Sequence, residues 1–252
     1  MFPSIRLFDN DVYMYDILVN TGTLMALAVL IFLLYKYKKL NKKNLAAFAV
    51  SLCVSFPFAA ILRRLMESED TAEIFCSGGS HFMGMVFAFY FIFPFVYKKI
   101  TKTAPTDDIK AISTSYFCIQ HFFSRLGCYC LGCCFGKPYD GIFAVTFPYG
   151  TNPYMIYEQE IPVFPTQLFE SFSMAVLIVL LAVLAAKKKE YVYFVFILLF
   201  SAVIFISEIF MYKYEYERML GIFSLPQICA VILIICEIVK FVNLKRSNKV
   251  MK

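Results

Sequence analysis

The sequence predicts an all-α protein whose helices cross a membrane about seven times, with the N-terminus outside and the C-terminus in the cytoplasm. Hydrophobic residues make up 60% of the 252-residue chain and charged residues only 17%, which is too apolar for a water-soluble domain. The apolar residues fall in runs of about 20, the length a helix needs to cross a hydrocarbon layer of about 30 Å. Basic clusters follow every second run.

The apolar runs set the positions of the expected helices. Seven runs are separated by basic clusters or polar loops, at 15–35, 45–62, 82–97, 111–130, 167–186, 191–211 and 222–243. The third run is short, and His121 and Arg125 interrupt the fourth. Because no internal repeat or Gly/Ser-rich linker divides the chain, residues 1–252 are expected to form a single transmembrane domain.

The basic residues predict the orientation. They follow the first, third, fifth and seventh runs: Lys36, Lys38, Lys39, Lys42, Lys43, Lys98, Lys99, Lys102, Lys187, Lys188, Lys189, Lys245, Arg246, Lys249 and Lys252. By the positive-inside rule these segments are cytoplasmic, so the N-terminus and the segments 63–80, 126–166 and 212–221 are expected outside. Arg63 and Arg64 are the exception to this pattern.

The formal net charge of +6 is spread between the apolar runs and does not form one stripe, so no nucleic-acid partner is expected. No cleavable leader is expected either, because Asp9 and Asp11 stand where a basic leader would be.

Four ionisable residues fall inside apolar runs, where a charge is costly unless it is paired or hydrated. They are His121, Arg125, Glu170 and Glu208. His121 and Arg125 are four residues apart and therefore share one helix face. One interpretation of Arg125 is structural: its side chain reaches the interface or forms an ion pair with Glu170 or Glu208. The other is functional: its planar guanidinium binds a lipid phosphodiester. His121 alone is more typical of a structural residue.

Residues 127–138 contain four of the nine cysteines and three glycines. Thiolates bind zinc and iron–sulfur clusters, but a second ligand pair is missing and the two histidines lack a metal-binding spacing, so neither a metal nor another cofactor is expected. A disulfide within the segment stays possible because the segment is expected outside, although the adjacent Cys133 and Cys134 cannot easily bridge each other. Gly127 and Gly136 allow backbone N–H groups to approach a ligand closely.

A second dense segment, 162–171, predicts the start of a membrane helix. Pro165 ends the preceding extended chain, Thr166 is expected to cap the helix, and Gln167 and Glu170 present polar groups from its first turns. These side chains either complete an ordinary interfacial helix start or contribute to a binding site.

Three segments together resemble the bacterial prolipoprotein diacylglyceryl transferase family in motif and order: RLGCYCLGCCFG at 125–136, TFP at 146–148 and PVFPTQLFE at 162–170. Further matching residues lie elsewhere in the chain: Tyr15, Gly79, Ser80, His81, Glu208, Leu225, Pro226 and Gln227. The resemblance therefore extends over nearly the whole sequence.

The resemblance implies a seven-helix enzyme of the bacterial plasma (inner) membrane with its N-terminus outside, in agreement with the lysine pattern. Such enzymes take part in lipoprotein biosynthesis. They transfer the diacylglyceryl group of phosphatidylglycerol to the lipobox cysteine in the signal peptide of a prolipoprotein, and they release glycerol phosphate. The implied partners are thus phosphatidylglycerol, other membrane lipids and the prolipoprotein signal peptide.

The resemblance also implies roles for individual residues. Arg125 matches the arginine that holds the lipid headgroup, His81 a histidine proposed as general base, and Glu208 an acidic residue of the penultimate helix. These three are the expected catalytic residues. The expected substrate-binding residues are Tyr15, Gly127, Cys128, Gly136, Gln167 and Glu170.

Several positions depart from the family pattern. Cys128 stands where better-known members have Asn, Cys133 lies near a position that is acidic in them, Phe164 replaces His, and Phe169 and Phe200 replace Tyr. Ile204 occupies the position of a second arginine, and a candidate to supply that charge is Arg63, Arg64 or Arg218. These departures leave two alternatives, namely the same fold acting on a different acceptor and a non-catalytic lipid-binding membrane protein.

Overall fold

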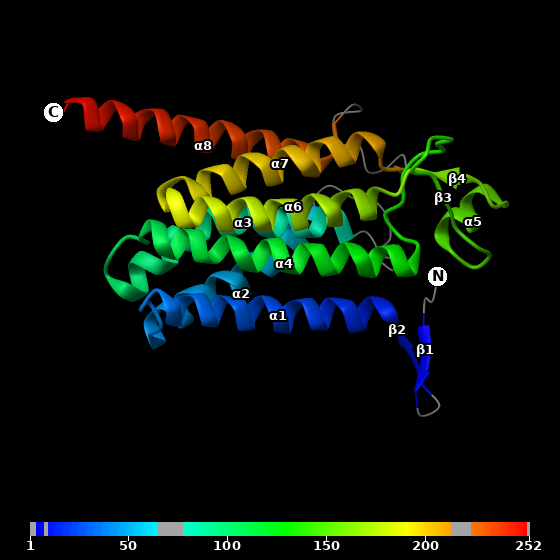
Figure 1. The fold of residues 1–252 in the computed structure, drawn as a ribbon, viewed down its shortest axis with the longest axis horizontal. Coiled ribbons are helices and arrows are strands. Elements are labelled where there is room, and N and C mark those ends of the chain that lie inside the picture. Colours follow the sequence, from blue (N-terminus) through cyan, green and yellow to red (C-terminus); the bar gives the residue numbers. More distant parts are fainter. Residues whose placement is uncertain (1–3, 8–9, 65–77, 213–222, 251–252) are drawn as a thin grey trace.

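A computed structural model describes residues 4–7, 10–64, 78–212 and 223–250 of the chain. Long helices run side by side along the longest axis of the molecule (Figure 1). They are α1 (Met14–Lys36), α2 (Lys42–Arg64), α3 (Gly78–Thr101), α4 (Asp107–Leu131), α6 (Thr166–Lys187), α7 (Val192–Phe210) and α8 (Leu225–Val250). A short 3-10 helix, η2 (Lys189–Tyr191), connects α6 to α7.

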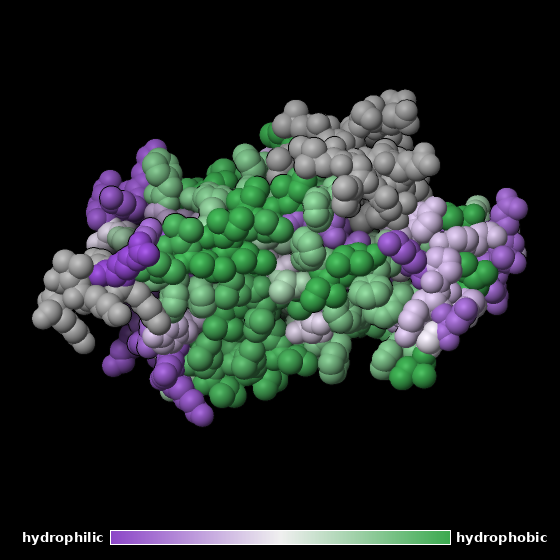
Figure 2. All heavy atoms as spheres, turned by 90° about the horizontal axis from the view of Figure 1, so that it is seen from above, coloured by the Kyte–Doolittle hydropathy of each residue, from purple (hydrophilic) through white to green (hydrophobic). Residues whose placement is uncertain are grey.

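Six helical segments in the described part of the chain are long and apolar enough to cross a membrane. They are α1, α2, α3, α6, α7 extended by η2, and α8. Figure 2 shows hydrophobic residues filling the middle of the visible face and hydrophilic residues gathered at its two ends. This arrangement is that of a polytopic membrane protein, because the apolar middle matches the hydrocarbon layer and the polar ends match its two interfaces.

The remaining long helix, α4, is the polar one, and it packs against α1, α3, α6 and α7. Its buried residues include Ser113, Thr114, Gln120, His121 and Arg125. A polar helix is tolerated at membrane depth when its polar side chains face protein and not lipid. The position of α4 therefore explains why a less apolar helix lies among six apolar ones.

Aromatic rings fill much of the core beside α4. Phe89 and Phe93 stack with ring centroids 4.7 Å apart, and Phe117 of α4 meets Phe89 edge to face at 4.8 Å. Phe196 and Phe200 of α7 continue the cluster toward His121, whose ring centroid lies 5.4 Å from that of Phe200. This packing fixes α4 in rotation and depth relative to α3 and α7.

Short elements collect at the end of the bundle opposite the C-terminus (Figure 1). The strands β1 (Ser4–Leu7) and β2 (Asn10–Tyr13) form an antiparallel hairpin before α1. Residues 132–165, which we call the cap, contain β3 (Val145–Thr146), α5 (Asn152–Tyr157) and β4 (Pro162–Val163). β3 and β4 pair antiparallel, and Phe135, Phe147 and Val163 form a small buried core beneath them.

The predicted helices agree with the structure. Each of the seven predicted runs overlaps one long helix, and the all-α polytopic class is confirmed. The strands and α5 were not predicted, because strands of two to four residues and a helix of six residues are too short to carry a detectable periodicity. The number of membrane crossings, the direction of the chain across the membrane and the single domain stay predictions.

The contact between α1 and α4 provides a test of this packing. A Cβ added at Gly22 would lie 2.5 Å from Cβ of Phe123, which cannot swing away because it is attached directly to the α4 backbone. Gly22→Ala is therefore expected to push the helices apart and to lower the free energy of unfolding by about 1–3 kcal/mol, despite the better helix propensity of alanine. Unfolding in detergent measures the change.

Thr21, the exposed residue before Gly22, provides the control, because Thr21→Ala should leave the free energy of unfolding nearly unchanged. Equal stability of the two variants would contradict the close packing of α1 on α4.

Candidate active site

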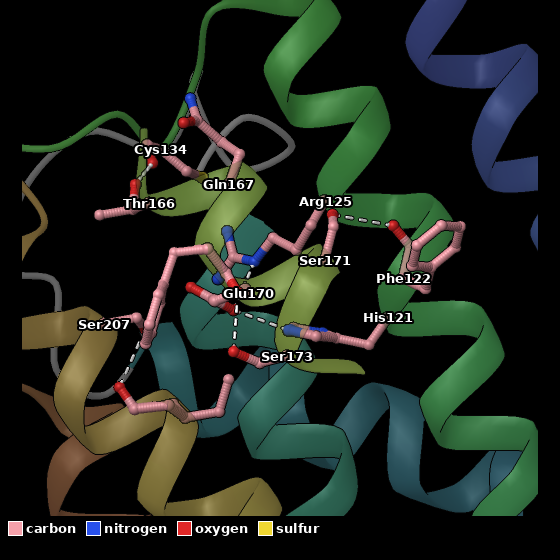
Figure 3. Close-up of polar contacts among 12 residues, drawn as sticks. His121, Phe122, Arg125, Cys134, Thr166, Gln167, Glu170, Ser171, Ser173 and Ser207 are labelled. Atoms are coloured by element: carbon pink, nitrogen blue, oxygen red, sulfur yellow. Dashed lines mark hydrogen bonds and ion pairs between the residues drawn. The ribbon is translucent and has the colours of Figure 1, made fainter. Parts of the chain in front are cut away.

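The centre of the candidate site is a buried ion pair between α4 and α6. Nε of Arg125 donates a hydrogen bond to Oε2 of Glu170 at 2.7 Å, and the side chains are 2% and 0% exposed. Nε2 of His121 lies 2.7 Å from the same carboxylate oxygen. Figure 3 shows both α4 side chains pointing toward Glu170. One carboxylate thus holds two basic side chains that are one helical turn apart.

The pairing is what allows these groups to be buried. An isolated arginine in a low-dielectric interior costs several kcal/mol, and an opposite charge in hydrogen-bonding contact compensates much of this cost. The phenyl ring of Phe82 packs against the imidazole of His121 with ring centroids 4.5 Å apart, so an apolar side chain of α3 covers the histidine. Of the two structural partners considered for Arg125, Glu170 makes the direct contact.

The ion pair leaves several strong hydrogen-bonding atoms unused. Nη1 and Nη2 of Arg125 are buried and have no hydrogen-bond partner among the described residues. Oε1 of Glu170 makes no hydrogen bond of normal geometry there either, although the Ser207 hydroxyl lies close to this carboxyl group. A buried donor without a partner costs about 1–3 kcal/mol, and more when it is charged. Two unpaired donors on one planar guanidinium can bind two oxygens of a single anionic group.

The first turn of α6 is anchored to the cap just above the ion pair. The Thr166 hydroxyl donates to the carbonyl of Cys134, and Nε2 of Gln167 donates to the carbonyl of Cys133 at 2.6 Å. The prediction that Thr166 is the N-cap residue of α6 is wrong. Pro165 occupies the N-cap position of this helix, and Thr166 is the first helical residue. Its hydroxyl instead satisfies a carbonyl of the cap, as Figure 3 shows.

Glu208 lies near the end of α7 and joins it to the start of α8. The Ser224 hydroxyl donates to Oε2 of Glu208 at 2.6 Å, and the amide N–H of Ser224 donates to Oε1 of Gln227. Glu208 also lies close enough to Arg125 to interact with it electrostatically. One turn earlier on the same helix, Ile204 is 1% exposed, so an apolar side chain is buried at the position where the resemblance implied a second arginine.

Two glycines serve close approaches of backbone. A Cβ on Gly127 would lie 3.0 Å from Cδ2 of Tyr15, so this glycine lets α1 bring Tyr15 against α4 beside Arg125. Gly136 lies between the carbonyl oxygens of Phe164 and Phe210, and its N–H donates to Phe164 at 2.9 Å. The loop of the cap thereby contacts both the segment before α6 and the end of α7.

The structure thus gathers most of the predicted site residues at one end of the bundle: Tyr15, Arg125, Gly127, Cys128, Gly136, Gln167, Glu170 and Glu208. The backbone of His81 lies in α3, but its side chain is outside the described part, as are those of Arg63 and Arg64, and Arg218 is outside it entirely. Sequence reasoning missed Ser224, because a serine near a helix start carries no signal for its partner. The pocket between α1, α4 and α6 that includes Lys36 and Lys189 belongs to the opposite end of the bundle.

A family model described as prolipoprotein diacylglyceryl transferase matches residues 4–243, nearly the whole chain. The chain belongs to this family. A comparison with curated proteins finds no individual match. Family membership makes the protein a transferase of lipoprotein biosynthesis, and its apolar helices make it a multi-pass membrane protein.

The Arg125–Glu170 pair can be tested by a double-mutant cycle. Glu170→Gln leaves a buried guanidinium without its counter-charge and is expected to lower the free energy of unfolding by about 3–5 kcal/mol. Adding Arg125→Met removes the orphaned charge, so the double variant should be more stable than Glu170→Gln alone. Chemical unfolding in detergent measures both. A double variant whose destabilisation equals the sum of the two single effects would rule out a direct ion pair.

The close approach at Gly136 gives a second prediction. Gly136→Ala should displace the cap loop, because the new Cβ would collide with the Phe164 carbonyl and meet that of Phe210 at 3.0 Å. Limited proteolysis on membranes is expected to cleave the cap faster than in the wild type. Gly84→Ala, whose new Cβ would meet the Ala59 methyl carbon at 3.3 Å, provides a control within the bundle. Unchanged cleavage of the cap in Gly136→Ala would argue against tight packing there.

Proposed function

We propose that the protein transfers the diacylglyceryl group of phosphatidylglycerol to the lipobox cysteine of a prolipoprotein at the outer face of the bacterial plasma membrane. The observation that carries this proposal is the buried guanidinium of Arg125, which Glu170 holds through Nε while Nη1 and Nη2 have no partner among the described residues. Two parallel N–H donors match two oxygens of a phosphodiester.

The reaction requires that a sulfur–carbon bond form while a carbon–oxygen bond breaks. The acceptor thiol loses its proton and its sulfur attacks the glycerol carbon that carries the phosphate, and glycerol phosphate leaves with the bonding electron pair. Negative charge therefore grows on the phosphate in the transition state. A guanidinium already fixed at that position by Glu170 stabilises this charge without reorganising.

The other predicted site residues surround this position. Tyr15, Gly127 and Cys128 are the groups proposed to line the lipid side, and Gly136 and Gln167 belong to the cap side. Glu208 is proposed to act with Arg125, and His81 is proposed as the base that accepts the thiol proton. The nucleophile is supplied by the substrate, so no cysteine of this chain is required to attack.

The position of the site supports the proposed side of the membrane. The Arg125–Glu170 pair lies at the cap end of the bundle, whereas Lys36, Lys98 and Lys187 lie in the last turns of their helices at the opposite end. If the basic end is cytoplasmic, the site opens toward the outer leaflet. Exported prolipoproteins would then reach it from outside.

Transfer of labelled diacylglycerol from phosphatidylglycerol to a lipobox peptide by the purified protein tests the proposal. Arg125→Ala is expected to lower the rate about 10²–10³-fold, because it removes the group that stabilises the leaving phosphate. Arg125→Lys keeps the charge but loses the planar guanidinium, so its rate should lie between that of the wild type and that of Arg125→Ala. Arg246→Ala, an exposed position near the end of α8, should act like the wild type.

The outcomes separate the alternatives. Release of glycerol phosphate without labelling of the peptide would indicate a different acceptor on the same fold. A folded wild type that binds phosphatidylglycerol without releasing glycerol phosphate would indicate a lipid-binding protein and overturn the proposal, as would full activity in Arg125→Ala.

A further inference from the structure

Three cysteine thiols converge beside the ion pair. The sulfur atoms of Cys128, Cys133 and Cys134 all lie within 4.8 Å of one another, and each thiol is within hydrogen-bonding reach of the other two. Cys128 and Cys133 are buried, and Cys134 is partly exposed. Cys130, in the same segment, is not a member of the group.

The backbone explains how residues close in sequence bring three thiols together. Cys128 lies in the last turn of α4, which ends at Gly132 in the left-handed conformation with φ 77°. Cys134 also has a positive φ of 55°, which is uncommon for a residue with a Cβ. Two left-handed residues within three positions fold the chain back so that Cys133 and Cys134 face Cys128. Uncommon backbone conformations of this kind concentrate at functional sites.

We propose that Cys128, Cys133 and Cys134 bind one thiophilic metal ion of the class of Zn²⁺ or Cu⁺. Soft thiolate ligands select these ions. An ion that binds three sulfurs at about 2.3 Å holds them about 4.0 Å apart in a plane, as for three-coordinate Cu⁺, or about 3.8 Å apart in a tetrahedral Zn²⁺ site, so sulfurs that lie within 4.8 Å of one another need to approach by about 1 Å at most. Binding displaces the thiol protons to solvent and changes no oxidation state.

The surroundings favour such an ion. Arg125 lies close enough to Cys128 and Cys134 to interact with them electrostatically, and its positive charge opposes in part the burial and mutual hydrogen bonds that keep these thiols protonated before an ion binds. Partly exposed Cys134 provides an entry path. Gln167 donates to the Cys133 carbonyl, and its own buried Oε1 has no partner among the described residues, so it offers an acceptor for a water that would complete the coordination of Zn²⁺.

A bound metal ion would affect the position of the Arg125–Glu170 pair through the backbone of its ligand residues. The carbonyl of Cys134 accepts a hydrogen bond from Thr166 at the start of α6 (Figure 3), and the carbonyl of Cys133 accepts one from Gln167. An ion that joins Cys128 of α4 to these two residues would therefore fix the start of α6 relative to the end of α4. These are the helices that carry Glu170 and Arg125. The proposal does not depend on which reaction the site performs.

A disulfide is the competing use of the same thiols. Adjacent Cys133 and Cys134 cannot easily bridge each other, so a disulfide would pair Cys128 with one of them and leave the other free. An ion uses all three thiols, which is why the three-way contact favours metal binding.

Titration of the reduced, chelator-treated full-length protein in detergent with Cd²⁺ tests the site, since thiolate-to-cadmium charge transfer absorbs in the ultraviolet. One ion per chain is expected. Loss of a partner outside the ligand shell weakens metal sites about 10–100-fold, so Cys128→Ser, Cys133→Ser and Cys134→Ser should each weaken binding at least about 100-fold. Cys130→Ser is the matched control and should bind as the wild type does. X-ray absorption of the Zn²⁺-loaded wild type should show three sulfurs at about 2.3 Å.

A readout on the wild type covers the case in which a variant fails to fold. Bound Zn²⁺ should protect Cys134 from alkylation, while the partly exposed Cys130, which is not one of the three ligands, should react at the same rate with and without the ion. The proposal is overturned if the reduced wild type shows no charge-transfer absorption, if the triple serine variant absorbs equally, or if only a Cys128 disulfide forms and the reduced protein binds no ion.

Discussion

The packing of the bundle around the candidate site depends on one buried ion pair, between Arg125 and Glu170. Arg125 is the only buried arginine or lysine among the described residues, and Glu170 is its direct counter-charge. A charge at this depth is tolerated only when protein surrounds it. This constraint explains why α4 carries polar residues along its buried face, why it packs against four other helices, and why Glu170 stands at the cap end of α6 and not at its middle.

Much of the fold could be predicted from the sequence because the thickness of a bilayer fixes helix length. Seven runs of suitable length gave seven helices, and the intramembrane charges at 121, 125, 170 and 208 identified the residues that meet at one end of the bundle. The contacts between them could not be predicted, because they join residues about 45 positions apart. Nothing in the sequence distinguished Glu170 from Glu208 as the direct partner of Arg125.

The contact among the three cysteine thiols could not be predicted from the sequence either. Their density in 127–138 was conspicuous, but spacing alone gave no complete ligand set, since known motifs place ligand pairs on separated segments. The structure selects three of the four local cysteines through two left-handed residues, one of which is not glycine. A positive φ at Cys134 depends on the surrounding cap and is therefore not readable from the residue type.

The cap determines the geometry of the site, because one short stretch ties together the three helices that supply it. Cys133 and Cys134 accept hydrogen bonds from the start of α6, while the N–H of Lys137 donates to Phe210 at the end of α7. Cys133 in turn lies two residues after the end of α4. Movement of residues 133–137 would thus shift Arg125, Glu170 and Glu208 relative to one another. Because these contacts fix the positions of the helices that carry the two unpaired Nη atoms, the loop is as much a part of the candidate site as the charged side chains are.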